Sequence, residues 1–215
     1  MTWEEIARAA AAHHLGVYAA LHPEADPHLP QGTRTLLLLG PREPGYWPAL
    51  TAGPEWRDGR PDPVDRWSLR VIGALAERFG ARAVFPFGGP PFLPFVSWAL
   101  ASGWVQSSPV NLLVHGEAGL WVSFRGALAL RERLALPPPP APPCPACAGQ
   151  PCRTACPVAA LTPAGYDTAA CKAFVTGPEG HACRTGGCQV RSACPAGQRH
   201  GRLAAQSAYH MTQFL

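Results

Sequence analysis

The first 143 residues of this chain contain no cysteine, although the chain has 8 cysteines in all. Charge is also scarce, because Asp, Glu, Lys and Arg make up only 15% of the 215 residues. The formal net charge is +4, and no block of like charge is present. A weak and dispersed positive charge does not indicate nucleic-acid binding. The cysteines therefore define a C-terminal region, and the cysteine-free remainder must have a separate role.

Two kinds of segment are missing from the sequence. No apolar stretch reaches the roughly 18 residues that span a bilayer. The N-terminal MTWEEIARAAAAHHLG has acidic residues where a secretory signal needs basic ones, and histidines interrupt its apolar part. We therefore expect a soluble, cytoplasmic protein with no membrane partner. In that reducing compartment clustered cysteines more often bind metal than form disulfides.

The composition predicts two domains. Apolar residues make up 47% of the chain, which suffices for one good core or for one core with a small satellite domain. The segment PPPPAPP at 137–143 is a stiff, extended spacer, and the composition changes after it. We predict an α/β (α+β) domain over residues 1–136 and a cysteine-rich domain over residues 144–215. The second domain has few large apolar residues and needs more than its own core to fold.

The residue patterns predict mixed helix and strand in the first domain. Gly- and Pro-rich segments at 40–50 and 53–63 are expected to be loops. Apolar periodicity and capping residues predict helices over 2–21, 65–80, part of 90–104 and, in the second domain, 203–215. Short apolar runs predict strands at 35–40, 81–86, 110–115 and 120–128, the last two as a hairpin.

The segment CPACAGQPCRTACP at 144–157 has the spacing C-x2-C-x4-C-x3-C-P. A 4Fe–4S cluster takes four thiolates, and in two-cluster ferredoxins the Cys-Pro thiolate binds the neighbouring cluster. The remaining four cysteines end on a second Cys-Pro, in ACPAG at 193–197, so the count fits two clusters. Structural zinc and disulfides remain alternatives. A zinc ribbon needs two C-x-x-C pairs, and the sequence has one.

Three regions of the chain, one in the cysteine-rich part and two in the first domain, resemble epoxyqueuosine reductase and the related iron–sulfur reductases and cobalamin-processing proteins. The cysteine segments CPACAGQPCRTACPVAAL, DTAACKAF and ACRTGGCQVRSACP follow the order of that family's two-cluster module. DRWSLRVIGALAERFG and PPFLPFVSWALASGWVQSSPVNLLVHGEAGLWVSFRGAL are similar to parts of its α/β domain. The resemblance implies a flavin-reductase-like domain followed by a ferredoxin-like domain with two 4Fe–4S clusters.

The resemblance also implies which thiols hold each cluster. The last three cysteines are spaced more widely than in the family. Two alternatives therefore remain: two clusters, or one cluster with unused thiols. The first cluster would be held by Cys144, Cys147, Cys152 and Cys194, and the second by Cys156, Cys171, Cys183 and Cys188.

Asp65 stands where the family has a catalytic acid, at the start of the long helix, and the same resemblance implies a cobalamin in the α/β domain. The next residues, Arg66 and Trp67, differ from the family's Tyr-His, and an aspartate at a helix start also acts as a cap. Two functions follow from these observations. One is a reductase whose clusters pass electrons to a cofactor or small-molecule substrate in the α/β domain. The other is a ferredoxin-like carrier that docks a redox partner protein.

Overall fold

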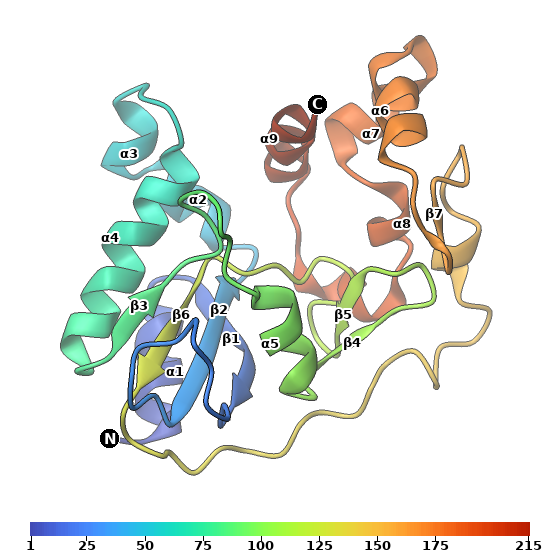
Figure 1. The fold of residues 1–215 in the computed structure, drawn as a ribbon. Coiled ribbons are helices and arrows are strands. Elements are labelled where there is room, and N and C mark those ends of the chain that lie inside the picture. The colour runs from blue at the N-terminus through green and yellow to red at the C-terminus, as the bar shows by residue number, and fades with distance from the viewer. The chain divides into compact units, whose positions relative to one another are not determined.

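The computed structural model describes residues 1–215, which form an α+β protein with two compact units. Unit 1 comprises Met1–Val105 and Ser123–Pro140, and unit 2 comprises Gln106–Val122 and Ala141–Leu215. Figure 1 shows the chain coloured by residue number. The division near residue 140 falls within the predicted proline-rich spacer. The segment 106–122, which the sequence placed in the first domain, belongs instead to the cysteine-rich unit.

Unit 1 is built on a four-stranded sheet in the order β1-β2-β6-β3. Every neighbouring pair in it is antiparallel. The strand predicted at 35–40 is confirmed, and because each residue of β2 and β6 is buried, both strands are covered on both faces. The strands are β1 (Leu15–Leu21), β2 (Thr35–Pro41), β3 (Arg82–Val84) and β6 (Gly126–Leu130).

Five helices accompany this sheet. Helix α4 contacts β3 and β6, whereas α1 and α5 contact β1. Helix α1 begins with a capping box in which Thr2 and Glu5 exchange hydrogen bonds, as expected for a Thr N-cap. None of the helices in the chain combines the length and the apolar character needed to cross a bilayer. The five are α1 (Trp3–Ala12), α2 (Tyr46–Thr51), α3 (Pro54–Arg57), α4 (Pro63–Arg78) and α5 (Phe95–Ala101).

The structure corrects three predictions for unit 1. The helix predicted over 2–21 ends at Ala12, because His14 turns the chain with a φ of 55° and the following residues pair with β2. The segments expected to be loops contain the short helices α2 and α3. Pro54 begins α3, a position that proline tolerates because the first helical N–H needs no partner.

The predicted hairpin of residues 110–115 and 120–128 is also wrong. Strand β5 (Leu113–His115) pairs with β4 (Val105–Ser107), whereas β6 enters the main sheet between β2 and β3. The turn between them closes only an isolated bridge from His115 to Gly119. After this bridge the chain leaves β5, because the apolar β6 finds two apolar partners in the larger sheet.

Unit 2 consists of short elements around a small core. Three core residues, Val110, Val114 and Leu120, come from the segment 106–122, and two are the cysteines Cys152 and Cys194. The longest helix of this unit, α9, confirms the helix predicted over residues 203–215. The elements after β5 are η1 (Pro151–Arg153), β7 (Leu161–Thr162), β8 (Gly165–Tyr166), α6 (Thr168–Thr176), η2 (Pro178–Gly180), α7 (His181–Gly186), α8 (Gln189–Ser192), η3 (Pro195–His200) and α9 (Ala204–Phe214).

The close approach of β2 to the segment before β6 gives a test of the unit 1 packing. A Cβ at Gly40 would lie 2.0 Å from the carbonyl oxygen of Ser123, and main chain cannot rotate away. We predict that Gly40→Ala lowers the free energy of unfolding by about 1–3 kcal/mol. Gly73→Ala, on α4, is the control, because the added Cβ has nothing within 4 Å. Alanine should raise the free energy of unfolding there by about 0.5–1 kcal/mol.

Denaturant unfolding followed by tryptophan fluorescence measures both variants, since six of the seven tryptophans lie in unit 1. A Gly40→Ala protein as stable as the wild type would contradict the packing described for β2.

Candidate functional site

Four cysteines of unit 2 line one cavity of about 450 Å³. Cys144, Cys147 and Cys152 lie close together in the sequence, and Cys194 follows more than forty residues later. The fold brings the fourth thiol to the first three. The rest of the wall is mostly apolar or small and is made by Ser108, Pro109, Val114, Leu120, Pro143, Ala146, Ala148, Gln150, Pro195 and Ala196.

Local turns place these four thiols. The backbone N–H of Cys147 donates to the carbonyl of Cys144 at 3.1 Å, which closes a turn between two cysteines of the C-x-x-C pair. Cys152 lies in η1, which begins at Pro151, and Cys194 directly precedes η3, which begins at Pro195. Proline starts both short helices because its fixed φ suits the first helical position.

Gly119 holds the 106–122 segment against the fourth thiol. Its φ is 54°, and a Cβ there would lie 2.3 Å from the amide nitrogen of Gly197 and 3.0 Å from Cys194 Sγ. Only glycine combines this φ with so close an approach. Arg191 also fastens the segment, because its guanidinium donates to the carbonyl of Leu120. These contacts keep Leu120 on the cavity wall.

The thiols around the cavity influence one another. Burial raises the pKa of Cys144, and the nearby thiols of Cys194, Cys152 and Cys147 raise it further. Burial likewise raises the pKa of Cys152, with a smaller contribution from Cys194 and Cys147. Four thiolates in apolar surroundings would repel one another, so they require a compensating positive charge. Metal ions provide that charge and displace the thiol protons on binding.

A second set of four thiols lies in the same unit: Cys156, Cys171 in α6, Cys183 in α7 and Cys188 at the start of α8. Burial raises the pKa of Cys171, and Cys188 and Cys156 add to this effect. Burial raises the pKa of Cys183 as well, and Cys188 and Cys171 again contribute. Cys171 and Cys183 therefore both lie close enough to other thiols of this set to be affected by their charge.

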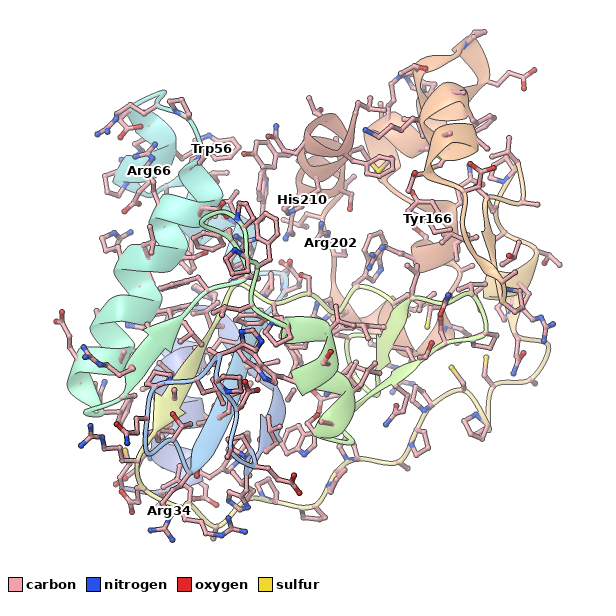
Figure 2. All side chains as sticks on the ribbon, in the orientation of Figure 1. Arg34, Trp56, Arg66, Tyr166, Arg202 and His210 are labelled. Atoms are coloured by element: carbon pink, nitrogen blue, oxygen red, sulfur yellow. The ribbon has the colours of Figure 1, made fainter.

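Three hydrogen-bond donors point at sulfurs of the second set. The backbone N–H of Ala160 donates to Cys156 Sγ at 3.2 Å, and Gln189 Nε2 lies 3.7 Å from Cys183 Sγ. The Tyr166 hydroxyl donates to Cys171 Sγ at 3.2 Å; Figure 2 labels this tyrosine. Burial, followed by the bond to Cys171, raises the pKa of Tyr166, so its hydroxyl keeps the proton that it donates.

All eight cysteines are free thiols in the structure. No group of three or more His, Cys, Asp or Glu side chains is arranged to hold a single metal ion. The cavity of about 450 Å³ is larger than one ion needs, since zinc–sulfur bonds are only about 2.3 Å long. A cavity with four thiols on its wall fits a group that takes one thiolate at each of several metal atoms, as an iron–sulfur cluster does.

Asp65 lies in the first turn of α4, where its carboxylate accepts a hydrogen bond from the Arg125 guanidinium. The same guanidinium donates from Nε to Ser68 Oγ at 3.3 Å and lies 5.3 Å from the centre of the Phe87 ring. The N-cap position belongs to Asp62, whose side chain makes no capping hydrogen bond. Asp65 therefore connects α4 to the segment before β6 through an ion pair.

Sequence reasoning missed the contribution of residues 106–122 to the cysteine cavity. Val114 and Leu120 look like ordinary strand residues in the sequence, and nothing in their spacing indicates a partner among the cysteines beyond residue 143. It also missed a cavity of about 790 Å³ in unit 1, lined by sixteen residues that include Trp98, Trp104, His22 and Asp26. In its wall Trp98 Nε1 donates to Asp26 Oδ2 at 2.6 Å.

Comparison with known proteins adds no relative to these observations. No protein-family model, no curated protein and no solved structure matches the chain. The chemistry of the site is therefore inferred from the thiols and from the groups around them.

Proposed function

We propose that this protein is an iron–sulfur redox protein whose unit 2 holds two 4Fe–4S clusters. The observation that carries the proposal is the cavity of about 450 Å³ with Cys144, Cys147, Cys152 and Cys194 on its wall. The second set of thiols supports a second cluster, because neighbouring thiols of the set raise the pKa of Cys171 and of Cys183. The resemblance to the two-cluster module of epoxyqueuosine reductases agrees with both sets, and with a ferredoxin-like unit 2.

Different residues of unit 2 would hold the clusters and shield them from water. Four thiols would hold each cluster, in the two sets described above. Val114 and Leu120 would exclude water from the first cluster, because they line its cavity and are almost fully buried. Donors such as Ala160 N–H would stabilise negative charge on the sulfurs of the second. When bound, such clusters supply one-electron transfer.

A second candidate function is a reductase in which unit 1 binds the substrate. The unit 1 cavity of about 790 Å³ favours it, since its two tryptophans and the Asp26 carboxylate combine apolar surface with a polar group. The proposal does not extend to cobalamin or to an acid role for Asp65. The Asp65 carboxylate is paired with Arg125, and the residues of this cavity come from other parts of unit 1.

The first test is the metal content of protein purified without oxygen. We predict about eight iron and eight acid-labile sulfide per chain, because each cluster contains four of each. The protein should be brown and should give electron paramagnetic resonance signals after reduction. Stoichiometric zinc without sulfide would instead establish the structural zinc site, and oxidised cysteines without metal would establish disulfides.

The second test separates the two clusters. Cys194→Ala should remove the cluster of the cavity and leave the other, although Cys194 lies far in sequence from its three partners. Cys171→Ala should remove only the second cluster. Each variant should therefore retain about four irons per chain and lose a different resonance signal. Full iron content and both signals in Cys171→Ala would reduce the second set to three thiols and leave one cluster as the answer.

A third test concerns the 106–122 segment. Gly119→Ala places a Cβ against Gly197 and Cys194 Sγ, so we predict that this variant loses the first cluster and keeps about four irons per chain. Gly186→Ala, at the end of α7, is the control, because its Cβ would have nothing within 4 Å. This variant should keep the iron content of the wild type. Equal iron content in both variants would mean that the segment does not position Cys194.

A further inference from the structure

Tyr166 provides a side-chain hydroxyl hydrogen bond to a cysteine sulfur of unit 2. Tyr166 ends β8, and its partner Cys171 lies in the following helix α6. Asp167, between them, caps α6 by accepting the N–H of Ala170 at 2.9 Å. The cap sets where α6 begins, and it thereby sets the position of Cys171 relative to the tyrosine.

The C-terminal end of the chain holds the tyrosine ring in place. The Tyr166 ring stacks on Phe214, with ring centres 6.0 Å apart and planes 10° from parallel. Lys172 Nζ lies 5.1 Å from the centre of the Phe214 ring and donates to the carbonyl of Leu215 at 3.4 Å. Lys172 follows Cys171 directly, so the same helix that presents the thiol also fixes the last turn of α9. The tyrosine, the phenylalanine and the thiol form one connected group.

A hydrogen bond to a ligand sulfur affects the two oxidation states of a cluster unequally. Reduction adds negative charge to the cluster and to its sulfurs, so a donor stabilises the reduced state more than the oxidised one. The Tyr166 residue is 40% exposed, which leaves water as the competing donor when the hydroxyl is absent. The Tyr166 hydroxyl is held in position because its ring stacks on Phe214, whereas a water molecule has no such restraint.

We propose that Tyr166 is a positioning residue that raises the reduction potential of the cluster held by Cys156, Cys171, Cys183 and Cys188. Its hydroxyl donates to Cys171 Sγ, and the stack on Phe214 keeps the hydroxyl aligned. The proposal rests on the proposed function, since it requires that this cluster is bound. It assigns no such role to the cluster proposed for the cavity, because the four thiols of that cluster belong to the first set.

The test is a redox titration of anaerobic protein, followed by electron paramagnetic resonance, with iron and sulfide measured in every sample. Tyr166→Phe removes the hydroxyl and keeps the ring. We predict unchanged iron content and a reduction equilibrium about tenfold less favourable for one cluster, the size of one ordinary hydrogen bond. For a one-electron couple this lowers the potential by about 59 mV.

Two matched variants isolate the cause. Phe214→Leu keeps the hydroxyl but removes the stack, so it should lower the same potential by a smaller amount. Thr212→Val removes a hydroxyl of α9 that donates only to its own helix, at Ala208, and should leave both potentials unchanged. A structural effect of Tyr166 alone would reduce the iron content and would not move the potential of the clusters that remain.

A substitution that keeps the ring and strengthens the donor covers the case in which Tyr166→Phe loses its cluster. Tyr166→3-fluorotyrosine carries a more acidic hydroxyl and should raise the potential of the same cluster near neutral pH. Unchanged potential in this variant, or in an iron-replete Tyr166→Phe protein, overturns the role of Tyr166. Wild-type protein without iron and sulfide would overturn the proposed function instead, so the two failures are distinct.

Discussion

The cost of forming several thiolates close together in largely apolar surroundings is the constraint on which unit 2 depends. Four thiols share a cavity with a largely apolar wall, and burial together with their neighbours raises the pKa of Cys144 and Cys152. Thiolates assembled in such surroundings need positive charge, and the described side chains around the cavity are mostly apolar or small. A metal cluster would supply both the missing charge and covalent links between distant parts of the chain. The same group would thus provide stability and redox chemistry.

This constraint explains the composition of unit 2. Its core contains only a few large apolar side chains, together with Cys152 and Cys194. Most of its helices are short, so little stability can come from the helices themselves. At Gly119 the absence of a side chain lets the backbone approach Cys194 closely. The proposed clusters would make thiols, turns and close backbone approach more important to this unit than a large apolar core.

Unit 1 follows different physics. Its sheet is buried on both faces at β2 and β6, and large aromatic side chains pack around it, for example Tyr46 against Trp67. The ion pair of Asp65 with Arg125 joins α4 to the chain entering β6. Such a unit is stabilised by ordinary apolar burial.

The sequence by itself determined the features that depend on neighbouring residues. The start of α1, the apolar strand β2, the helix α4 and the last helix α9 were all predicted from local patterns, because caps and periodicity act within a few residues. The grouping of the cysteines beyond residue 143 was equally visible. Tertiary structure alone decided that residues 15–21 form a strand, since pairing with β2 outweighs helix propensity there. It also decided that β5 and β6 enter different sheets, that residues 106–122 cover the cysteine cavity, and that Asp65 pairs with Arg125. Each of these depends on partners distant in the chain, and a single sequence carries no local signal for such a partner.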